Sequence, residues 1–516
     1  MSVFEIILVM LAVAVFLLAV ARQVKLPYPV LLAIAGAALA VAPVDLGLHL
    51  DPQFALALFI APVLLDAAYD TSLRDLKRHW APVASLVLIA VGLTTIATAF
   101  VVHTLVPTVP WAAAIAIGAI VAPPDAVAAT TVLRDVRLPH RISVILEGEA
   151  LLNDASALLI YRLAVAAVLA GGTLGTEAIA PAFLLSLFGS VIAGWALAWA
   201  IGRVTRQIAD APSSIIVQFV STYGVWVIAE RCGLSPILTM VTYAMTLARS
   251  TPGYLPARLR LPSYAVWETA VLVLNVLAFL VIGLELGPII AAAEPGELRR
   301  WFGVGAAILA TVIMVRLLWT MTAALWTHRR IIRGGAAAPG GGPLPGWRTG
   351  LVIGWAGTRG LVTVATALAL PHDFPERGML LFAAFTVTFG TLLIQGLTLR
   401  PLVLALRMGD DATVDREVRA ARIATAEAAL DALRGESGRE FEMLQAELDT
   451  ERRIAAAAGQ GDGRPTLPEK ALRAKVLAER RKTLLAMRNG GVIGDEAFHR
   501  LEEELDLADL AVATRT

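Results

Sequence analysis

Carboxylates lie inside otherwise apolar segments of this chain. The stretch EGEALLND places Glu147, Glu149 and Asp154 at the head of a run that continues ASALLIYRLAVAAVLA. Another acid, Asp125, directly follows two prolines in IVAPPDAVAAT. If these runs cross a bilayer, each ionised side chain at its centre costs about 2.5–3.5 kcal/mol on the insertion scale. Acids retained at that cost are typical of sites that bind ions or protons.

The composition indicates that these acids lie in a membrane. The chain has 516 residues, of which 57% are hydrophobic and 16% are charged, and its mean hydropathy is +0.72. Soluble proteins are about 45–50% apolar and about 25% charged. We therefore expect a polytopic all-α protein in the lipid bilayer. The net charge of +1 gives no electrostatic basis for binding nucleic acid, and the single Cys232 allows no internal disulfide or thiolate metal cage.

A helix needs about 20 apolar residues to cross a bilayer, and the sequence contains about 13 such segments by this measure. The first is interpreted as a span, because it lacks the basic region and the cleavage site of a signal peptide. Arginine and lysine concentrate in alternate loops, which predicts an external N-terminus and a cytoplasmic C-terminus. The predicted spans are 3–21, 28–44, 53–69, 81–105, 111–132, 142–170, 180–201, 214–230, 235–249, 264–287, 302–327, 349–370 and 378–404.

The composition changes sharply near residue 408. From there the chain has mixed charge at helical spacing, interrupted by the Gly/Pro-rich stretch GQGDGRPTLPE. We therefore predict a transmembrane domain over 1–407 and a helical cytoplasmic tail over 408–516. The tail is either a regulatory module or a solvated helical extension, and the sequence leaves both interpretations open.

Depth in the membrane singles out two of the acids. Asp154 follows the basic cytoplasmic loop by about 13 residues, which is roughly 20 Å along a helix. Asp125 lies about as far from the opposite face, so both approach the midplane. Pro123 and Pro124 lack backbone donors and break the helix before Asp125. Broken helices at this depth free carbonyl groups that can bind a cation around a cavity.

The helix predicted over 142–170 presents two neighbouring polar faces. Glu149 and Asn153 are four residues apart and share one face, while Ala150 and Asp154 share the next. We interpret Glu149 as one half of a structural ion pair with Arg359, in which the loss of either partner strands a charge. The alternative is that Glu149, Asn153 and Asp154 only hold helices together.

Four more charged residues fall within the predicted spans. Asp66 lies in LFIAPVLLDAAYD and Arg316 lies in IMVRLLW. Glu268 and Glu285 are nearer helix ends, where an interfacial position without a transport role is equally compatible with the pattern.

These segments together resemble the monovalent cation:proton antiporter family of bacterial NhaP-type and eukaryotic NHE-type sodium/proton exchangers. EGEALLND is similar to the family's E-G-E-S-L-x-N-D segment, and APPDAVAA to its T-D-P-V-A-V segment. GWAGTRGLVTVATALALP resembles its W-G-G-x-R-G stretch, while LLDAAYD, WETAVLVLNVLAFLVIGLEL and LLIQGLTLRPLV follow in family order. The resemblance extends from about residue 20 to 405.

The resemblance implies a homodimer in which each protomer has a dimerisation part and a mobile six-helix core. The fold it implies is an inverted repeat with two crossed broken helices. Asp125 and Asp154 then bind Na⁺ and protons, with Asn153 as the neutral neighbour that accompanies electroneutral exchange. It also assigns Asp66 to the cation/proton site, Glu149 to a pair with Arg359, and a supporting role to Arg316.

Two residues depart from the family pattern. Ala150 stands where the family often has Ser, and Pro124 replaces the common Thr before the acid. Each change removes an oxygen that could bind the cation.

The resemblance implies a secondary antiporter that exchanges Na⁺, or Li⁺, for H⁺ without a cofactor. Burial and a second nearby carboxylate both favour the protonated form of an acid, so a proton and a cation compete for the same oxygens. K⁺/H⁺ exchange at the same site is the main alternative. A cation channel and an intramembrane hydrolase are further rivals, although the sequence contains neither HExxH nor a cysteine–histidine pair that would support an enzyme. An obligatory proton counterflow would separate an exchanger from a channel.

Overall fold

The computed structural model describes a helical protein with no strand among its described residues. Two compact units, Met1–Asp411 and Ala412–Thr516, divide the chain. The described residues are 3–24, 26–41, 52–125, 138–171, 176–251, 257–291, 293–294, 296–333, 346–408, 413–433 and short pieces between 442 and 507.

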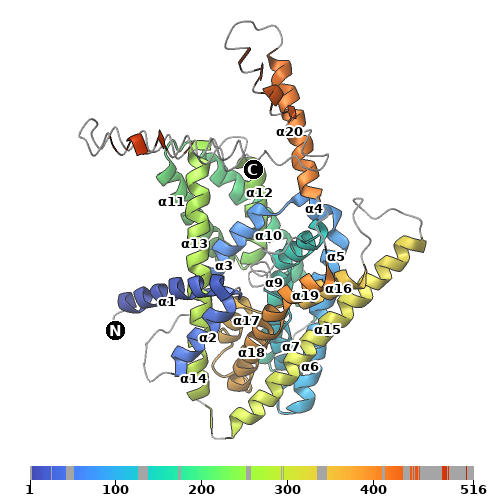
Figure 1. Cartoon of the computed structure of the whole chain (residues 1–516). Helices are drawn as coiled ribbons and strands as arrows, with labels where there is room; N and C mark the ends of the chain where they lie inside the picture. The colour runs from blue at the N-terminus through green and yellow to red at the C-terminus, as the bar shows by residue number, and fades with distance from the viewer. Residues whose placement is uncertain are drawn as a thin grey trace. The chain divides into compact units, whose positions relative to one another are not determined.

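One group of helices in the first unit centres on α13, which packs against α1, α2, α3 and α11. In the same group α12 packs against α3, α10 and α11. These helices come from the first and middle parts of the chain (Figure 1). Their bounds are α1 Val3–Val24, α2 Tyr28–Val41, α3 Pro52–Asp70, α10 Thr176–Thr205, α11 Ala211–Arg231, α12 Pro236–Ser250, α13 Ala257–Leu284 and α14 Leu286–Ala291.

Local sequence signals determine where these helices begin. The Asp210 carboxylate accepts the Ser213 backbone N–H at 2.8 Å and caps α11. Ser235 caps α12 in the same way, through the Leu238 N–H at 3.4 Å. In both cases a proline follows in the first turn, where its missing N–H costs no helical hydrogen bond.

The other group of helices surrounds α9. It includes the π-helical turns η1 and η3, each of which interrupts a longer helix. In this group α7 packs against α6 and α9, and α15 packs against α6, α16 and α18. The bounds are α4 Leu73–Arg78, α5 Trp80–Ala84, η1 Ser85–Ala90, α6 Val91–Leu105, α7 Trp111–Val121, α9 His140–Leu169, α15 Glu297–Arg333, α16 Trp347–Trp355, α17 Leu361–Leu368, α18 Arg377–Thr391, η3 Leu392–Gly396 and α19 Leu397–Leu406.

The two groups meet along α9 and α17. α3 packs against both of these helices, α12 packs against α9, and α13 packs against α17. α17 begins after a break in an otherwise continuous helix, since α16 ends at Trp355 and α17 starts at Leu361. α7 likewise ends at Val121, before the two prolines. The continuation of that predicted span, 126–132, lies outside the described residues.

Within the described part of the chain, seven helices are long and apolar enough to cross a membrane, and three shorter apolar helices accompany them. The breaks account for two of the predicted spans that do not meet this criterion, 111–132 and 349–370. α7, α16 and α17 have 11, 9 and 8 residues, so each is half of a crossing and too short alone. The number of crossings therefore stays a prediction.

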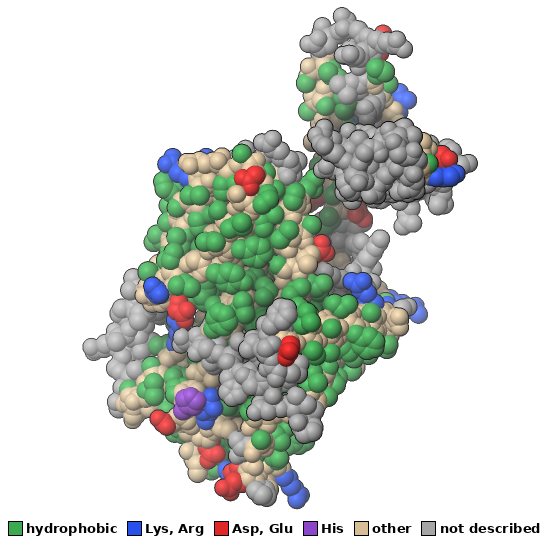
Figure 2. Space-filling view, turned by 90° about the vertical axis from the view of Figure 1, so that its left-hand side faces the viewer, with side chains coloured by type: hydrophobic (Ala, Val, Ile, Leu, Met, Phe, Trp, Pro, Cys, Tyr) green, Lys and Arg blue, Asp and Glu red, His purple; other side chains and the backbone are tan. Residues whose placement is uncertain are grey.

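The surface of the first unit is strongly apolar. Figure 2 shows hydrophobic side chains over most of the described surface on one face, with only scattered charged side chains between them. Large exposed apolar residues include Phe16 at 66%, Trp195 at 59% and Phe302 at 61% exposure. So extensive an apolar surface is unfavourable in water, whereas it suits contact with lipid chains.

The second unit contains α20, Thr413–Ala432, a charged helix that agrees with the helical spacing of the tail sequence. The second and third helical patterns predicted in the tail fall largely outside the described residues.

Candidate functional site

The break after α7 and the break between α16 and α17 are hydrogen bonded to each other. The backbone N–H of Asp125 donates to the carbonyl of Thr358 at 2.6 Å. The Thr358 hydroxyl lies 3.4 Å from the Asp125 carbonyl. Because Pro123 and Pro124 have no N–H, Asp125 is the first residue after the prolines that can donate in this way. The two unwound segments therefore meet backbone to backbone beside an acid.

Arg359 closes the end of α7. Its backbone N–H donates to the Thr391 hydroxyl on α18 at 2.9 Å. Its guanidinium donates to the carbonyls of Val121 and Ala122, both at 3.0 Å, and to that of Gly357. The terminal carbonyls of a helix lack partners and carry partial negative charge. A buried guanidinium that binds them stabilises the half-helix and the break that follows it.

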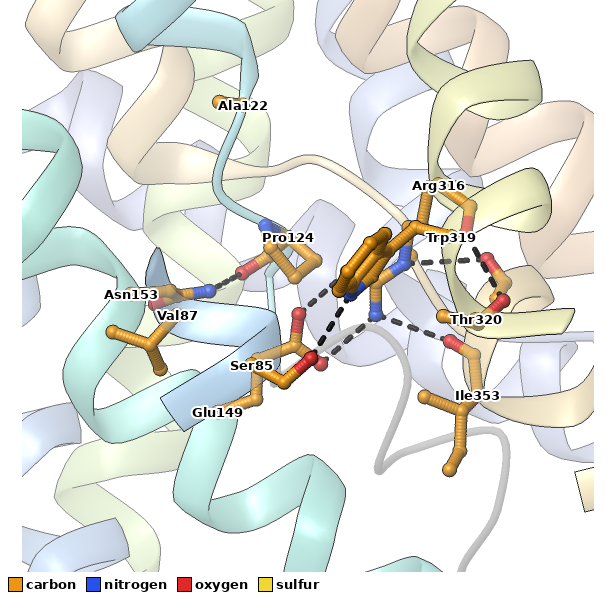
Figure 3. A network of polar contacts seen from close by, with 12 residues as sticks. Ser85, Val87, Ala122, Pro124, Glu149, Asn153, Arg316, Trp319, Thr320 and Ile353 are labelled. Carbon is orange, nitrogen blue, oxygen red and sulfur yellow. Dashed lines mark hydrogen bonds and ion pairs between the residues drawn. The ribbon is translucent and has the colours of Figure 1, made fainter. Parts of the chain in front are cut away.

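Arg316 on α15 does the same for α16 and also binds Glu149. Its Nη1 and Nη2 donate to the two Glu149 carboxylate oxygens at 2.5 and 2.9 Å. Nη2 and Nε donate to the carbonyls of Ile353 and Gly354 near the end of α16, at 3.1 and 3.3 Å. Figure 3 shows the guanidinium between the Glu149 carboxylate and Ile353.

This arrangement corrects the predicted pair of Glu149 and Arg359. Glu149 forms its ion pair with Arg316, whereas the Arg359 guanidinium donates its hydrogen bonds to backbone carbonyls. The physical reason is position: Arg359 lies within the break itself, so its side chain reaches the nearby end of α7. Arg316 comes from a neighbouring helix and faces the buried carboxylate on α9.

Asn153 and Asp154 lie next to each other on α9 and are both buried, at 0% and 7% exposure. The Asn153 amide nitrogen donates to the Pro124 carbonyl at 3.0 Å, the contact drawn in Figure 3. The Asn153 Oδ1 atom is buried and has no hydrogen-bond partner among the residues that the structure describes. The carboxylates of Asp154 and Asp125 are near enough for their charges to interact. The structure thus brings together four predicted residues, namely Asp125, Asp154, Asn153 and Pro124.

Gly360 is a residue of this site that the sequence analysis did not single out. A Cβ atom at Gly360 would overlap the Asp125 carboxylate oxygen Oδ2. Only a residue without a side chain lets the carboxylate lie against the backbone here. The signal was present in the second glycine of GTRG, but a glycine in a membrane helix has several uses and spacing alone does not choose among them.

The remaining predicted residues lie around this centre or away from it. Asp66 is half-buried on α3, a helix that packs against both α9 and α17. Ala150 lies one turn before Asp154 and is half-buried. Glu268 is exposed on α13, and Glu285 is half-buried between α13 and α14. Neither Glu268 nor Glu285 lies on α7, α9 or the α16–α17 break.

A polar cluster joins α4 to the start of α9. The buried Asp75 carboxylate lies 3.3 Å from His140 Nε2. Burial raises the pKa of Asp75, but hydrogen bonds from Arg74, Ser72 and His140 outweigh it and hold the pKa below its usual range. The buried His79 ring donates to the Asp75 carbonyl at 3.0 Å, and burial lowers the pKa of His79.

The same short helix reaches the Glu149 region. A Cβ atom at Gly148 would lie 2.6 Å from the side chain of Leu76 on α4. Leu76 therefore packs directly on α9 one residue before Glu149. The position of α4 on α9 depends on this apolar contact and on the polar cluster.

Comparison with known proteins identifies relatives of this chain. The family model described as "Sodium/hydrogen exchanger, transmembrane" matches residues 9–405. The matched range contains Asp125, Asp154 and Arg359 and all the segments on which the resemblance rests.

Individual relatives agree with that match. An uncharacterized Na⁺/H⁺ exchanger of Escherichia coli, YjcE, is 29% identical over 94% of this chain and 94% of its own length. A protein of Bacillus pumilus named as a sodium, potassium, lithium and rubidium/H⁺ antiporter is 29% identical over 77% of this chain and 61% of its own length. The solved structure of the sodium proton antiporter MjNhaP1 from Methanocaldococcus jannaschii has a TM-score of 0.60 at 16% identity, over 78% of this chain and 98% of that one. The last likeness shows a shared fold.

Proposed function

Because this chain belongs to the sodium/hydrogen exchanger family, we propose that it exchanges Na⁺, or Li⁺, for H⁺ at Asp125 and Asp154. The family consists of membrane transporters and not of enzymes, so the hydrolase alternative falls away. The observation that carries the proposal is the position of Asp125 at the two hydrogen-bonded breaks, near enough to Asp154 of α9 for the two charges to interact. Arg316 binds Glu149, and Arg359 donates to backbone carbonyls.

The ligands available at this centre suit a hard monovalent cation. Such ions prefer oxygen ligands, and the centre offers two carboxylates and the unpartnered Asn153 Oδ1. A freed amide oxygen compensates in part for the hydroxyls that Ala150 and Pro124 do not supply. We therefore include Asn153 among the cation ligands, with its amide nitrogen held by the Pro124 carbonyl.

The charges at the crossing support exchange of one cation for one proton. The guanidinium groups of Arg316 and Arg359 and the carboxylates of Glu149, Asp125 and Asp154 together leave one negative charge. One Na⁺ or one H⁺ neutralises that charge. Both loaded forms are then neutral and can cross a low-dielectric region at similar cost, whereas the empty site carries a charge and is held back.

Competition for the same oxygens couples the two flows. A protonated Asp154 no longer offers a full negative charge to Na⁺, and a bound Na⁺ excludes the proton. The site is carried between the two sides when the group of helices around α9 moves against the group around α13, which would be the dimerisation part. Asp66 on α3 belongs to the group around α13 and would face the site during part of that movement.

The remaining parts of the proposal concern the whole protein. We propose a homodimer in the plasma or inner membrane, with an external N-terminus and a cytoplasmic tail after about residue 407, as the loop charges predict. The transport assay should also test K⁺, because one relative is named for potassium as well as sodium.

The test uses purified protein in liposomes with an acidic interior and a trapped pH dye. External Na⁺ should alkalinise the interior in the wild type and in Glu268→Gln, an exposed acid on the same chain. Asp154→Asn should abolish the response without loss of folded protein. Sodium-driven proton flux in Asp154→Asn would refute the mechanism. A response to K⁺ that equals the response to Na⁺ would favour the alternative cargo.

Electroneutrality needs a separate measurement. A membrane potential imposed with valinomycin and K⁺ should leave the initial rate of Na⁺/H⁺ exchange unchanged, because neither loaded form carries net charge. A rate that follows the imposed potential would contradict exchange of one cation for one proton.

A further inference from the structure

The π-helical turn η3 carries a buried amide that the proposed mechanism does not use. Gln395 is 0% exposed, and within the described part of the chain neither its Oε1 nor its Nε2 has a hydrogen-bond partner. Burying an amide without a hydrogen-bond partner destabilises the folded protein. Chains seldom keep such a group unless something binds it. The residue belongs to LLIQGLTLRPLV, a segment that no role has yet explained.

The position of Gln395 connects it to the broken helix. Thr391, one turn earlier on the same long helix, accepts the backbone N–H of Arg359. Leu399, one turn later, is fully buried in a cluster with Val352 and Ile353 of α16. Gln395 lies between these two contacts on the same helix, and η3 itself packs against α2. The opposite face is apolar and exposed, at Leu393 and Ile394.

A second unpartnered group lies on the same face. Thr388, one turn before Thr391, is fully buried, and its hydroxyl has no hydrogen-bond partner in the described ranges. Thr388, Thr391 and Gln395 therefore form a polar stripe along α18 and η3. Only its middle member is bonded within the protein, to Arg359 and to the Thr388 carbonyl.

The other π-helical turn provides an internal comparison. Two residues of η1 are hydrogen bonded to other helices. The Val87 carbonyl accepts from the Ser156 hydroxyl of α9 at 3.0 Å, and the Ser85 hydroxyl accepts from the Trp319 indole of α15 at 3.1 Å. Figure 3 shows Ser85 and Trp319 beside the Glu149–Arg316 pair. The polar groups of η1 are thus bonded within the protein, whereas those of Gln395 in η3 are not. π-turns are frequent at functional sites, where they present backbone and side-chain groups to ligands.

The chemistry of an amide selects the ligand. The NH₂ group of Gln395 needs an acceptor and its carbonyl oxygen needs a donor or a cation. A bare cation would satisfy only the oxygen, while water both donates and accepts. Buried waters typically make about three hydrogen bonds to otherwise unsatisfied groups. The Gln395 amide and the Thr388 hydroxyl are such groups.

We propose that Gln395 and Thr388 bind ordered water beside the α16–α17 break, and that this water forms part of the route by which protons reach Asp125 and Asp154. The second half of the proposal rests on the proposed function. Each water accepts one proton and passes another on, so the route conserves protons and needs no titration of Gln395. Because a bare cation would leave the amide nitrogen without an acceptor, this site takes water and not sodium.

The first test detects the water without relying on transport. Hydroxyl-radical footprinting by X-ray radiolysis labels side chains next to bound water, and mass spectrometry locates the labels. Leu392 and Leu399, which flank Gln395 and are buried at 1% and 0% exposure, should be labelled. Leu380, equally buried at 0% in the apolar core, should not be. In Gln395→Leu the labels at Leu392 and Leu399 should disappear. Their absence in the wild type would overturn the water site.

The second test separates the proton route from the sodium route. Liposomes are assayed both for Na⁺/H⁺ exchange and for exchange of ²²Na⁺ against Na⁺ at one pH, a reaction that carries no proton. Gln395→Leu should slow Na⁺/H⁺ exchange by about tenfold, the change in rate that the loss of one hydrogen bond produces. The ²²Na⁺/Na⁺ exchange should stay at the wild-type rate. Equal loss of both activities, or loss of neither, would overturn the role in proton transfer.

A matched glutamine serves as the control. Gln218 on α11 is bonded within the protein to Ser263 at 3.2 Å and to the Trp267 indole at 2.7 Å. Gln218→Leu should change both exchange activities in the same proportion, through stability alone. If wild-type protein showed no Na⁺/H⁺ exchange at all, the proposed function would fail, and the footprint would still decide whether the water site exists.

Discussion

Glu149 on α9 and Arg316 on α15 form a buried two-pronged ion pair across a sequence separation of 167 residues. The same guanidinium binds the carbonyls near the end of α16. One side chain therefore joins three helices of the group that holds the proposed site. Because Asn153 lies one turn after Glu149 on α9, the pair also orients the helix that presents Asn153 and Asp154 to the break.

Loss of one partner of this pair should destabilise the protein strongly. Glu149→Gln strands the Arg316 charge, and removal of one member of a buried pair typically costs about 3–5 kcal/mol. Arg316→Gln should be similarly harmful. The double variant should be less harmful than the sum of the two changes, because no charge is left unpaired. The measurement is the thermal unfolding of all three variants in detergent, with the fraction of monodisperse protein as the readout.

Arg359 supplies the matched control for this experiment. Arg359→Gln should also destabilise the protein, since the carbonyls of Val121 and Ala122 lose their donors. Combined with Glu149→Gln, however, its effect should be close to additive. Stronger coupling of Glu149 to Arg359 than to Arg316 would contradict the pairing described above.

The choice between the two arginines illustrates what the sequence could and could not predict. That Glu149 needs a buried cation follows from its setting in an apolar helix. Which cation it meets depends on how α15 and the α16–α17 break cross α9, and the sequence pattern carries no information on that crossing. Spacing along α9 did distinguish the face of Glu149 from the face of Asp154, because both lie on one regular helix.

The end of α7 was predictable from local chemistry, and the family and the fold were predictable from the resemblance. Pro123 and Pro124 cannot continue a helical hydrogen-bond pattern, so the end of α7 near Asp125 was predictable from two residues. The predicted family and the all-α antiporter fold are confirmed by the family match and by the structural likeness to MjNhaP1. The close approach of Gly360 to Asp125 was not predictable, because it joins segments more than 230 residues apart that meet only in the fold.

Gly360→Ala should slow exchange strongly while the protein stays folded. The new Cβ would overlap the Asp125 carboxylate and force it away from the crossing. We expect Na⁺/H⁺ exchange to fall by at least about tenfold, since a displacement of about 1 Å at a reacting centre can cost a hundredfold. The initial rate of dye dequenching in liposomes provides the measurement.

Gly92→Ala on α6 is the control for that change. A Cβ atom at Gly92 meets nothing within 4 Å, so the substitution adds the same methyl group to open space. It should leave exchange unchanged. Wild-type exchange and apparent Na⁺ affinity in Gly360→Ala would mean that Asp125 need not occupy this position, and the proposed cation site would then lose one of its two acids.

Acidification should loosen α4 from α9 through His79. Burial lowers the pKa of the folded-state His79 below its ordinary value of about 6.5, so below that pH the unfolded segment binds more protons than the folded one. The stability contributed by neutral His79 is therefore present above about pH 6.5 and is lost as the pH falls through the lowered folded-state pKa. Asp75 stays ionised in this window because its pKa is also held low.

Hydrogen–deuterium exchange of the peptide covering residues 72–80 measures this effect, after correction for the intrinsic pH dependence of exchange. His140 Nε2 lies 3.3 Å from the Asp75 carboxylate, and the charges of Arg78 and Arg141 act on His79, so these three residues stay unchanged in the comparison. His79→Gln keeps a donor for the Asp75 carbonyl but does not titrate. The difference between the wild type and His79→Gln should grow as the pH falls below about 6.5. Identical profiles would show that His79 does not control the docking of α4.

Ala150→Ser should tighten Na⁺ binding by restoring an oxygen that this chain lacks. Ala150 lies one turn before Asp154 on α9, so a serine hydroxyl there would join the carboxylate and the Asn153 oxygen around the cation. One added interaction of about 1 kcal/mol lowers the Na⁺ concentration for half-maximal exchange by about fivefold. Ala164→Ser places the same hydroxyl on the same helix, in the apolar core, and should leave that concentration unchanged.

A serine hydroxyl can also bond back to the carbonyl four residues earlier. If Ala150→Ser behaves like Ala164→Ser, the hydroxyl has taken that local bond, and the Ala150 face of α9 does not touch the ion.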